Sequence, residues 1–321
     1  MKTRAAVLHE TGRPRPYAET RPLLVEDLDL APPGEGEVLV RIGAAGLCHS
    51  DLSVVNGDRP RPVPMALGHE AAGEVAEVGP GVNDLRPGDH VVMVFVPSCG
   101  HCLPCMEGRP ALCEPGAVAN GVGSLLSGGR RMSLEGRPVH HHMGVSAFSE
   151  YVVCARPSLV KIDNDLPLEE AALFGCAVLT GVGAVVNTAR VVPGSSVAVV
   201  GLGGVGLNAL LGARLAGAQR IVAVDVLDDK LALARELGAT DTFNAGEEEV
   251  AARIKEATGG GVDYVMKVVA PDVDAYQRLM DDLLGRDLEI ERYYSYIVTK
   301  SVKETAELPL DRLLDAADRS A

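Results

Sequence analysis

Short apolar runs separated by glycine and proline characterise the first 175 residues of the chain. Clear examples are residues 37–42, 73–78 and 90–94. Apolar stretches of this length, bounded by turn residues, are typical of β-strands. The pattern therefore predicts a mostly β region in the N-terminal part of the chain.

The pattern changes near residues 168–186, where small apolar residues indicate packed helices. From residue 196 onward, apolar strands alternate with segments of helical periodicity, and short links join them. This alternation is typical of a parallel sheet covered by helices. The predicted strands are 196–200, 220–225, 242–243, 262–269 and 290–299, and the predicted helices are 204–216, 228–237, 247–257 and 272–284.

Three parts of different composition follow from these patterns. We expect a mostly β domain over residues 1–177, a parallel-sheet domain over residues 178–262 and a distinct tail over residues 263–321. Five of the seven tyrosines lie in that tail. A chain of 321 residues is long enough for two domains with a large buried core.

Composition and charge narrow the class of protein. The chain is 47% hydrophobic and 23% charged, which is typical of an ordered globular protein. A net charge of −14 disfavours nucleic acid as a partner, because phosphate binding needs clustered lysine and arginine. No apolar run reaches the roughly 18 residues of a membrane span, and the start of the chain lacks the apolar core of a signal peptide. We expect a cytoplasmic protein with neither nucleic acid nor membrane as a partner.

Four of the seven cysteines are closely spaced. Cys99, Cys102, Cys105 and Cys113 form a C-x₂-C-x₂-C-x₇-C cluster. Four thiolates in one loop can form a closed tetrahedral zinc site, and a reducing cytosol favours metal ligands over disulfides. The odd number of cysteines and the tight spacing also disfavour disulfides. Two further cysteines, Cys48 and Cys176, together with His69 would leave a fourth metal position open for chemistry.

A glycine-rich turn follows the strand at residues 196–200 and opens an apolar helix. Its glycines permit a tight turn, close approach to a pyrophosphate and close packing of helix against strand. Asp225 ends the next strand nineteen residues after Gly206, where its carboxylate would bind the adenosine ribose hydroxyls and repel a 2′-phosphate. The sequence therefore predicts NAD rather than NADP, bound by Gly201, Gly203, Gly204, Gly206 and Asp225.

The segment Gly68-His69-Glu70, with the residues that follow as far as Gly79, resembles the signature of zinc-containing medium-chain alcohol dehydrogenases. The resemblance covers about residues 1–263 and includes residues 48–51, the four-cysteine cluster, Cys176 and the glycine turn. It implies an α/β fold, in which a mostly β GroES-like catalytic domain with a structural zinc lobe precedes a truncated Rossmann-type domain. The implied reaction is NAD-dependent oxidation of a small alcohol to an aldehyde or ketone.

The resemblance also implies roles for residues near the metal. Cys48, His69 and Cys176 would hold a catalytic zinc ion, and the cysteine cluster would hold a structural one. Glu70 would lie beside the metal, and Asp51 would accept the free ring N–H of His69. Ser50 would carry the alcohol proton away. A histidine standing alone would more simply be a core residue, but here the matching cysteine motifs support the ligand assignment.

Other positions are assigned by the same resemblance. His49 stands where relatives place a basic residue on the pyrophosphate, and Lys230 where they contact the adenosine ribose. Relatives often continue the proton relay to a histidine, and this chain has Ser53 there. Phe95 resembles a wall of the substrate pocket. Glutathione-dependent relatives carry an arginine where this chain has Ala117, which favours a general primary or secondary alcohol as substrate.

Two features have no part in the resemblance. His140, His141 and His142 resemble a metal tract, but we expect them in a surface turn because the family match needs none of them as ligands. Cys154 belongs to no motif and is expected to be a small buried hydrophobic residue.

The tail departs from the dehydrogenase pattern. From Asp263 to about residue 310 it resembles the end of leucine-responsive, Lrp/AsnC-type regulators, with the join near residues 261–264; a divergent dehydrogenase tail is the alternative. The segments that complete both domains in relatives are not recognisable in this tail. An alternative is therefore a protein that binds zinc and nucleotide without turnover and whose tail mediates assembly. A regulator that senses an amino acid is disfavoured, because no N-terminal helix-turn-helix is present. An exposed sheet edge in the tail region predicts a homo-oligomer.

Overall fold

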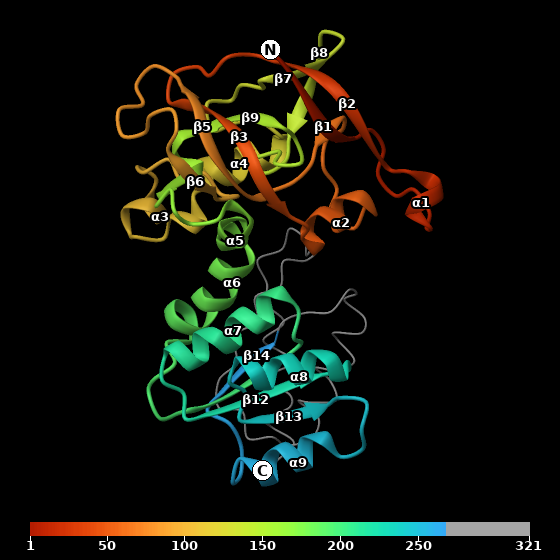
Figure 1. Ribbon diagram of the computed structural model, residues 1–321, viewed down its shortest axis with the longest axis vertical. Coiled ribbons are helices and arrows are strands. Elements are labelled where there is room, and N and C mark those ends of the chain that lie inside the picture. Colours follow the sequence, from red (N-terminus) through yellow and green to blue (C-terminus); the bar gives the residue numbers. More distant parts are fainter. Residues whose placement is uncertain (268–321) are drawn as a thin grey trace, which may run out of the picture.

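A computed structural model describes residues 1–267 of the chain (Figure 1). The described part has an upper, mostly β region and a lower region built on a parallel sheet, with a run of helices between them. The predicted helix at residues 272–284, the predicted strand at 290–299 and the regulator-like segment lie outside the described residues.

The β region contains a closed barrel and a second sheet. The barrel has the strand order β1 (Lys2–Leu8), β2 (Leu23–Leu30), β7 (Met132–Leu134), β8 (Arg137–His141) and β4 (Met65–Ala66). The sheet has the order β10 (Leu159–Ile162), β6 (His90–Met93), β5 (Glu70–Val78), β3 (Glu37–Gly46) and β9 (Tyr151–Ala155). Alternate residues of these strands turn inward, and one apolar core joins the barrel to the sheet.

The central strands are longer than the apolar runs that predict them. β3 extends to Gly46 and β5 begins at Glu70, because the two strands remain paired antiparallel as far as these two residues. This register brings the chain after β3 alongside the chain before β5. It therefore sets Cys48 and His69 at the same end of the sheet.

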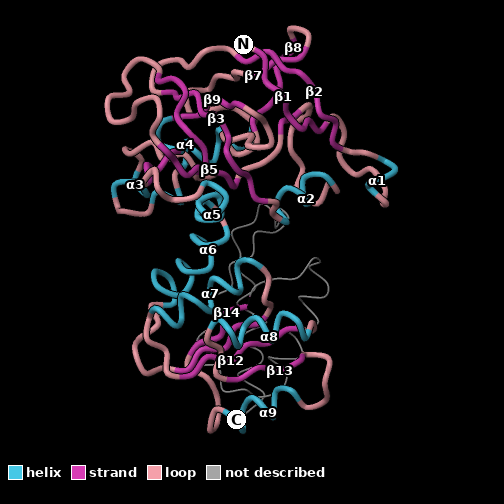
Figure 2. Tube along the Cα trace, in the orientation of Figure 1, coloured by secondary structure: helices cyan, strands magenta, loops and turns pink. Residues whose placement is uncertain are grey.

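Short helices carry the loops of the β region. They are α1 (Tyr17–Thr20), α2 (His49–Val55), α3 (Leu103–Met106), α4 (Glu114–Val122) and the 3₁₀ turns η1 (Pro110–Leu112) and η2 (Arg156–Ser158). Figure 2 shows more strand than helix in this region, as the sequence predicts.

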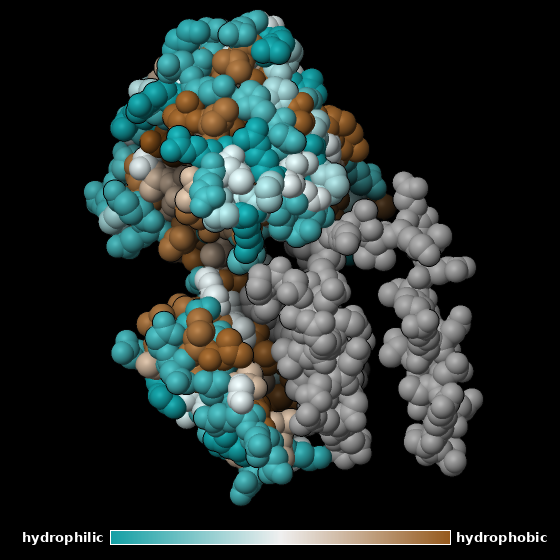
Figure 3. Space-filling view, turned by 90° about the vertical axis from the view of Figure 1, so that its right-hand side faces the viewer, coloured by the Kyte–Doolittle hydropathy of each residue, from teal (hydrophilic) through white to brown (hydrophobic). Residues whose placement is uncertain are grey.

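A nearly continuous helical segment connects the two regions. It consists of α5 (Leu168–Ala171), η3 (Ala172–Gly175), α6 (Ala177–Gly183) and the π-helical turn η4 (Ala184–Ala189). Within residues 1–267, no single helix is long and apolar enough to cross a membrane. The segments Leu168–Gly175 and Ala177–Ala189 meet the length and composition requirement only when taken together, and the chain bends by 51° between them. Apolar side chains gather at the narrow part of the molecule here, whereas the outer faces are mostly hydrophilic (Figure 3).

The lower region is built on a parallel four-stranded sheet. Its order is β13 (Asp241–Asn244), β12 (Arg220–Asp225), β11 (Ser196–Val200) and β14 (Tyr264–Lys267), with all neighbours parallel. The helices α7 (Gly204–Leu215), α8 (Asp228–Leu237) and α9 (Val250–Ala257) connect the strands. This is the 3-2-1-4 part of the 3-2-1-4-5-6 order of a doubly wound sheet.

The predicted bounds of β11, β12 and α8 agree with the structure, and α7 ends one residue early. α9 begins at Val250 rather than at residue 247. The residue before it, Glu249, has φ 54°, so a left-handed residue separates the acidic segment from the helix.

Candidate active site

Three separate elements bring Cys48, His69 and Cys176 together. Cys48 is the N-cap of α2, His69 immediately precedes β5, and Cys176 is the N-cap of α6. The two sulfurs are 3.9 Å apart, and Cys176 Sγ lies 3.5 Å from His69 Nε2. Two thiolates and an imidazole sharing a tetrahedral zinc ion would have S–S and S–N separations of about 3.8 and about 3.6 Å. The donor set fits that ion.

Two glycines allow the chain to place these ligands. Gly68, with φ 93°, adopts a left-handed conformation, and an added Cβ would lie 2.4 Å from the backbone nitrogen of Phe148. Gly175 lies so close to β6 that an added Cβ would be 2.2 Å from the carbonyl oxygen of Met93. A side chain at either position would displace backbone next to a ligand.

Asp51 orients the ring of His69. Its Oδ1 lies 3.1 Å from His69 Nδ1 and accepts the N–H of Gly68, and its Oδ2 accepts the N–H of Cys48. The carboxylate thus supports two of the three ligands from one buried position. Occupation of Nδ1 leaves Nε2 of His69 directed at the sulfurs, as metal-binding histidines require.

Charges are unevenly distributed over this cluster. A hydrogen bond from Cys176, followed by the influence of His69, lowers the pKa of Cys48 to about 3, while the pKa of Cys176 is raised by the same bond. Burial opposes the charged form of His69, but hydrogen bonds to Asp51 and Cys48 outweigh it and raise the pKa to about 9. Binding of a divalent cation would release the protons that remain on these ligands.

Glu70 joins the same cluster from the first position of β5. It is 3% exposed, and its Oε1 accepts the backbone N–H of Ala177 at the start of α6. Burial raises the pKa of its carboxyl group. The side chain links the β sheet to the helix that carries Cys176.

The structure corrects the expectation for the histidine tract. His140 and His141 belong to β8, and both His141 and His142 are fully buried, so assignment to a surface turn is wrong. Parallel pairing of β8 with β4 and a bond from the His142 N–H to the Ala66 carbonyl draw the segment inward. Val139 and His141 are buried on either side of the less buried His140, as in a strand, but three consecutive histidines show no such alternation in the sequence itself.

His142 is the site residue that sequence reasoning missed. Its ring lies edge-on to His69 with centroids 5.5 Å apart, and its Nδ1 is 3.2 Å from Asp51 Oδ1. Those two atoms are not aligned as a hydrogen bond, so neither ring nitrogen has a hydrogen-bond partner among residues 1–267. Phe95 also lies edge-on to His69, at 5.7 Å, which places it beside the metal ligands.

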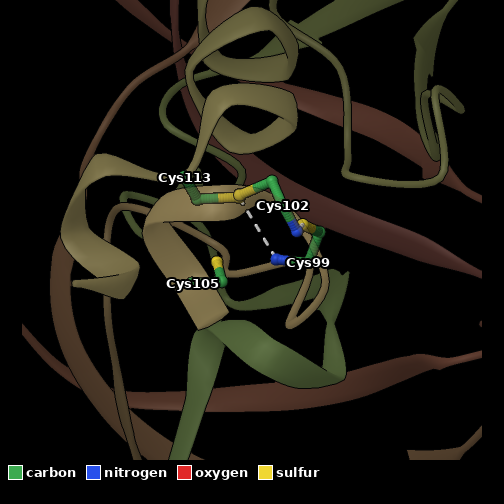
Figure 4. A group of neighbouring side chains, drawn as sticks. All are labelled: Cys99, Cys102, Cys105 and Cys113. Atoms are coloured by element: carbon green, nitrogen blue, oxygen red, sulfur yellow. Dashed lines mark hydrogen bonds between the residues drawn. The ribbon is translucent and has the colours of Figure 1, made fainter. Parts of the chain in front are cut away.

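The other four cysteines form a second cluster on the loop that contains α3, η1 and α4. Figure 4 shows their side chains arranged around a common centre, and one donor atom from each lies within 4.8 Å of the others. Backbone N–H groups of Cys99 and Gly116 donate to the sulfur of Cys113, and that of Cys102 donates to the sulfur of Cys99. N–H groups directed at sulfur favour thiolates, as a closed Cys₄ zinc site requires.

The pKa values in this cluster diverge because the thiols share protons. The N–H of His101 and then that of Cys102 help to lower the pKa of Cys99 to about 6. Burial, together with bonds to the neighbouring sulfurs, raises the pKa of Cys105 to about 12. Cys154, in contrast, is fully buried in β9 away from both clusters, as expected for a small hydrophobic residue. All seven cysteines are free thiols.

The glycine turn and Asp225 are connected directly. Gly201 has φ 89° and Gly203 is the N-cap of α7, so the turn leads straight into the helix. The carboxylate of Asp225 accepts the N–H of Leu202 at 2.6 Å and that of Leu227 at 3.1 Å. An ionised carboxylate has about four acceptor positions, so capacity remains for ribose hydroxyls.

The remaining residues predicted to act in the site lie in the first turns of two helices. His49 and Ser50 are the first two residues of α2, with His49 exposed and Ser50 half-buried, and Lys230 lies in the first turn of α8. The hydroxyl of Ser53 donates to the His49 carbonyl at 3.0 Å, so it bonds within its own helix.

The chain is similar to known proteins. Residues 34–164 match the family described as alcohol dehydrogenase GroES-like domain, and residues 204–282 match zinc-binding dehydrogenase. The chain is 45% identical over 272 residues to S-(hydroxymethyl)glutathione dehydrogenase of Synechocystis sp. (strain ATCC 27184 / PCC 6803 / Kazusa), covering 84% of this chain and 72% of that protein.

Solved structures agree. Benzyl alcohol dehydrogenase of Acinetobacter calcoaceticus superposes with a TM-score of 0.83 at 32% identity, covering 99% of this chain and 82% of that one. An alcohol dehydrogenase zinc-binding domain protein of Burkholderia ambifaria gives a TM-score of 0.78 at 40% identity, covering 84% and 71%.

The fold and the two cysteine-containing clusters thus define a zinc-binding dehydrogenase. The chain belongs to the zinc-containing medium-chain alcohol dehydrogenase family, with a GroES-like domain followed by a Rossmann-type domain. It is a zinc-dependent, NAD-linked oxidoreductase acting on small alcohols or aldehydes. The alternative of a protein without turnover receives no support from these relatives.

Proposed function

We propose that Cys48, His69 and Cys176 form the catalytic zinc site of an enzyme that oxidises small primary or secondary alcohols with NAD. The observation that carries this proposal is the donor set of two sulfurs and an imidazole nitrogen, drawn from three elements and spaced for one tetrahedral ion. Three protein ligands leave the fourth position to the substrate, as in catalytic rather than structural zinc sites.

Nearby residues have complementary roles in this proposal. Zinc supplies a Lewis acid that favours loss of the alcohol proton and stabilises charge on its oxygen, and NAD supplies the hydride acceptor. Asp51 holds the His69 ring with Nε2 facing the ion, and Glu70 holds the start of α6 beside it. Ser50 accepts the proton of the alcohol.

The structural zinc site in this proposal is the Cys₄ cluster of Cys99, Cys102, Cys105 and Cys113. Its four donors leave no open position, which suits an ion that holds the loop rather than one that reacts.

Cofactor binding is assigned to the lower sheet. The N–H groups at the start of α7, behind Gly201, Gly203, Gly204 and Gly206, face the pyrophosphate together with His49. Asp225 and Lys230 bind the adenosine ribose. The buried position of Asp225 at the strand end favours NAD, because a 2′-phosphate would meet its carboxylate.

Substrate choice within the family is the next part of the proposal. Ala117 is exposed in α4 and offers no charge for a glutathione carboxylate at that position. We therefore assign small alcohols, rather than the glutathione adduct named for the Synechocystis relative, as the preferred substrates. S-hydroxymethylglutathione turned over far more efficiently than simple alcohols would overturn this assignment.

Initial-rate measurements test the activity. Zinc-loaded protein is assayed for NADH formation across short, branched and aromatic alcohols, with Cys48→Ser as the inactive variant and Cys154→Ser as the matched control. Turnover lost only in Cys48→Ser supports the assignment. Equal activity in wild type and Cys48→Ser would refute it.

Assembly and origin complete the proposal. The domains are assigned to residues 1–177, 178–262 and 263–321, and the last is derived from an Lrp/AsnC-type regulator on its sequence pattern. The sheet has β13 and β14 at its edges within residues 1–267, which supports homo-oligomer formation. We assign the protein to the cytoplasm on its composition. A monodisperse monomer by light scattering would refute the oligomer.

Replacing residues 263–321 with the matching Synechocystis segment is expected to raise kcat, because small errors in positioning the nicotinamide slow hydride transfer.

A further inference from the structure

The loop between α2 and β4 runs beside the catalytic cluster. It begins after the helix that carries Cys48 and Asp51, and it ends in the strand that precedes His69. The N–H of Arg59 donates to the Ser53 carbonyl at 2.8 Å, and the carbonyl of Pro64 accepts the N–H of His140 at 2.8 Å. These bonds tie the loop to α2 at one end and to β8 at the other.

Two arginines in this loop belong to neither the zinc sites nor the cofactor site proposed above. Arg59 and Arg61 are both half-buried, and neither forms an ion pair with a carboxylate of residues 1–267. The nearest acid in sequence, Asp58, is bound by the amide of Asn56 at 2.7 Å. The Nε of Arg61 is buried and has no hydrogen-bond partner within the same residues. A buried, unpaired guanidinium N–H is costly, so a partner of opposite charge is expected.

The bond between Arg59 and the Ser53 carbonyl places the loop beside α2, the helix whose N-cap is Cys48. Burial lowers the pKa of both guanidinium groups, and Arg61 lowers that of Arg59 further because the two positive charges are close. The thiolate of Cys48 acts on Arg59 in the opposite direction. Arg61 is also among the charges that lower the pKa of His142. Arg59 and Arg61 therefore bring two positive charges to the loop that follows α2, in a chain whose net charge is −14.

We propose that Arg59 and Arg61 bind a carboxylate carried by the alcohol substrate, so that the preferred substrates are hydroxy acids. This inference rests on the proposed function and names its substrate class. Guanidinium groups bind carboxylates through paired N–H bonds, and desolvation at a half-buried site strengthens these bonds. Two adjacent guanidinium groups would hold one end of the substrate while its hydroxyl reaches the metal position.

Rates for matched substrates test the proposal. ω-Hydroxy acids of three to six carbons are compared with their neutral amides, in wild type, Arg59→Gln and Arg61→Gln. Arg86→Gln, at an 84% exposed side chain, is the control. One lost charged hydrogen bond corresponds to roughly a 10- to 100-fold effect. We expect kcat/KM for the acids to fall by that factor in either loop variant, and kcat/KM for the amides to change less than about 3-fold.

A binding measurement separates failure of this inference from failure of the proposed function. Butanoate and butanamide are titrated calorimetrically into zinc-loaded protein, so no turnover is needed. Butanoate binding that is lost in both loop variants supports the inference even if no alcohol is oxidised. Turnover of alcohols without any preference for acids over amides, in wild type, overturns the inference and leaves the proposed function intact.

Three further outcomes also overturn it. An equal fall for acids and amides would mean that the arginines only balance the charge of the thiolate ligands. A weakened affinity for NADH, with an unchanged ratio of acid to amide, would mean that they bind a cofactor phosphate. S-Hydroxymethylglutathione is included, and an arginine-dependent preference for it would keep the anion site but reject the small hydroxy acid.

Discussion

Nδ1 of His69 lies 3.1 Å from Oδ1 of Asp51, with both side chains buried. This contact selects the tautomer in which Nε2 is free to face the sulfurs of the catalytic cluster. The same carboxylate also receives the N–H of Cys48. One side chain therefore orders two ligands from different parts of the chain.

Replacing that carboxylate should weaken metal binding. Asp51→Asn keeps the size of the side chain but removes the charge that holds His69, so zinc affinity at the catalytic site is expected to fall about 10- to 100-fold. Competition with a colorimetric chelator measures the change, and Ser53→Ala on the same helix is the control. Unchanged affinity would show that the bond does not support the ligand.

The two clusters should lose metal independently. Cys48→Ser is expected to bind one zinc ion per chain instead of two and to retain its fold, because the cysteine loop remains intact. Cys105→Ser should also bind one ion but with a lower melting temperature, because a closed zinc site contributes directly to folding. Elemental analysis and thermal unfolding test this. Loss of both ions in either variant would contradict it.

Asp225 should control cofactor choice. Asp225→Ala removes the acceptor for the ribose hydroxyls, so the affinity for NADH should fall about 10-fold or more. It also removes the repulsion of a 2′-phosphate, so the ratio of NADH affinity to NADPH affinity should decrease. Fluorescence titration with both nucleotides measures this. The variant also loses bonds to Leu202 and Leu227, so Asp225→Asn serves as the conservative comparison. An unchanged NADH-to-NADPH ratio in both variants would contradict the assignment.

A buried acid in the β region should make stability depend on pH. Glu37 is 1% exposed, and burial alone would raise its pKa, but bonds from Arg131, Gly34 and Ser127 lower it below its ordinary value of 4.5. A lowered pKa in the folded state stabilises the protein above about pH 4.5, and that stabilisation is lost as pH falls through the folded value. Wild type should therefore lose more unfolding free energy between pH 6 and pH 3 than Glu37→Gln does.

Removing the same side chain entirely should cost more. Glu37→Ala leaves Arg131 without its 2.7 Å partner, and breaking a buried pair in this way costs about 3 kcal/mol. Urea unfolding at pH 7 measures this, with exposed Glu135→Ala as the control. A cost below about 1 kcal/mol would show that the pair contributes little.

Local signals were sufficient for much of the fold. The period of apolar residues predicted β11, β12 and α8 with the bounds that the structure shows, because these elements are long and strongly patterned. The spacing of Cys99, Cys102, Cys105 and Cys113 predicted their cluster, since ligands within fifteen residues need only one loop to meet.

The sequence by itself determined the family and indicated the candidate metal donors, because donor types and glycine spacing are properties of the chain. Tertiary structure alone decided which distant residues meet. The register of β3 against β5 sets Cys48 beside His69, and the pairing of β8 with β4 buries His142 beside Asp51. The role proposed for Arg59 and Arg61 likewise depends on their burial in the structure, which no motif in the sequence indicates. Contacts between segments far apart in sequence depend on strand register and burial, which no local pattern specifies.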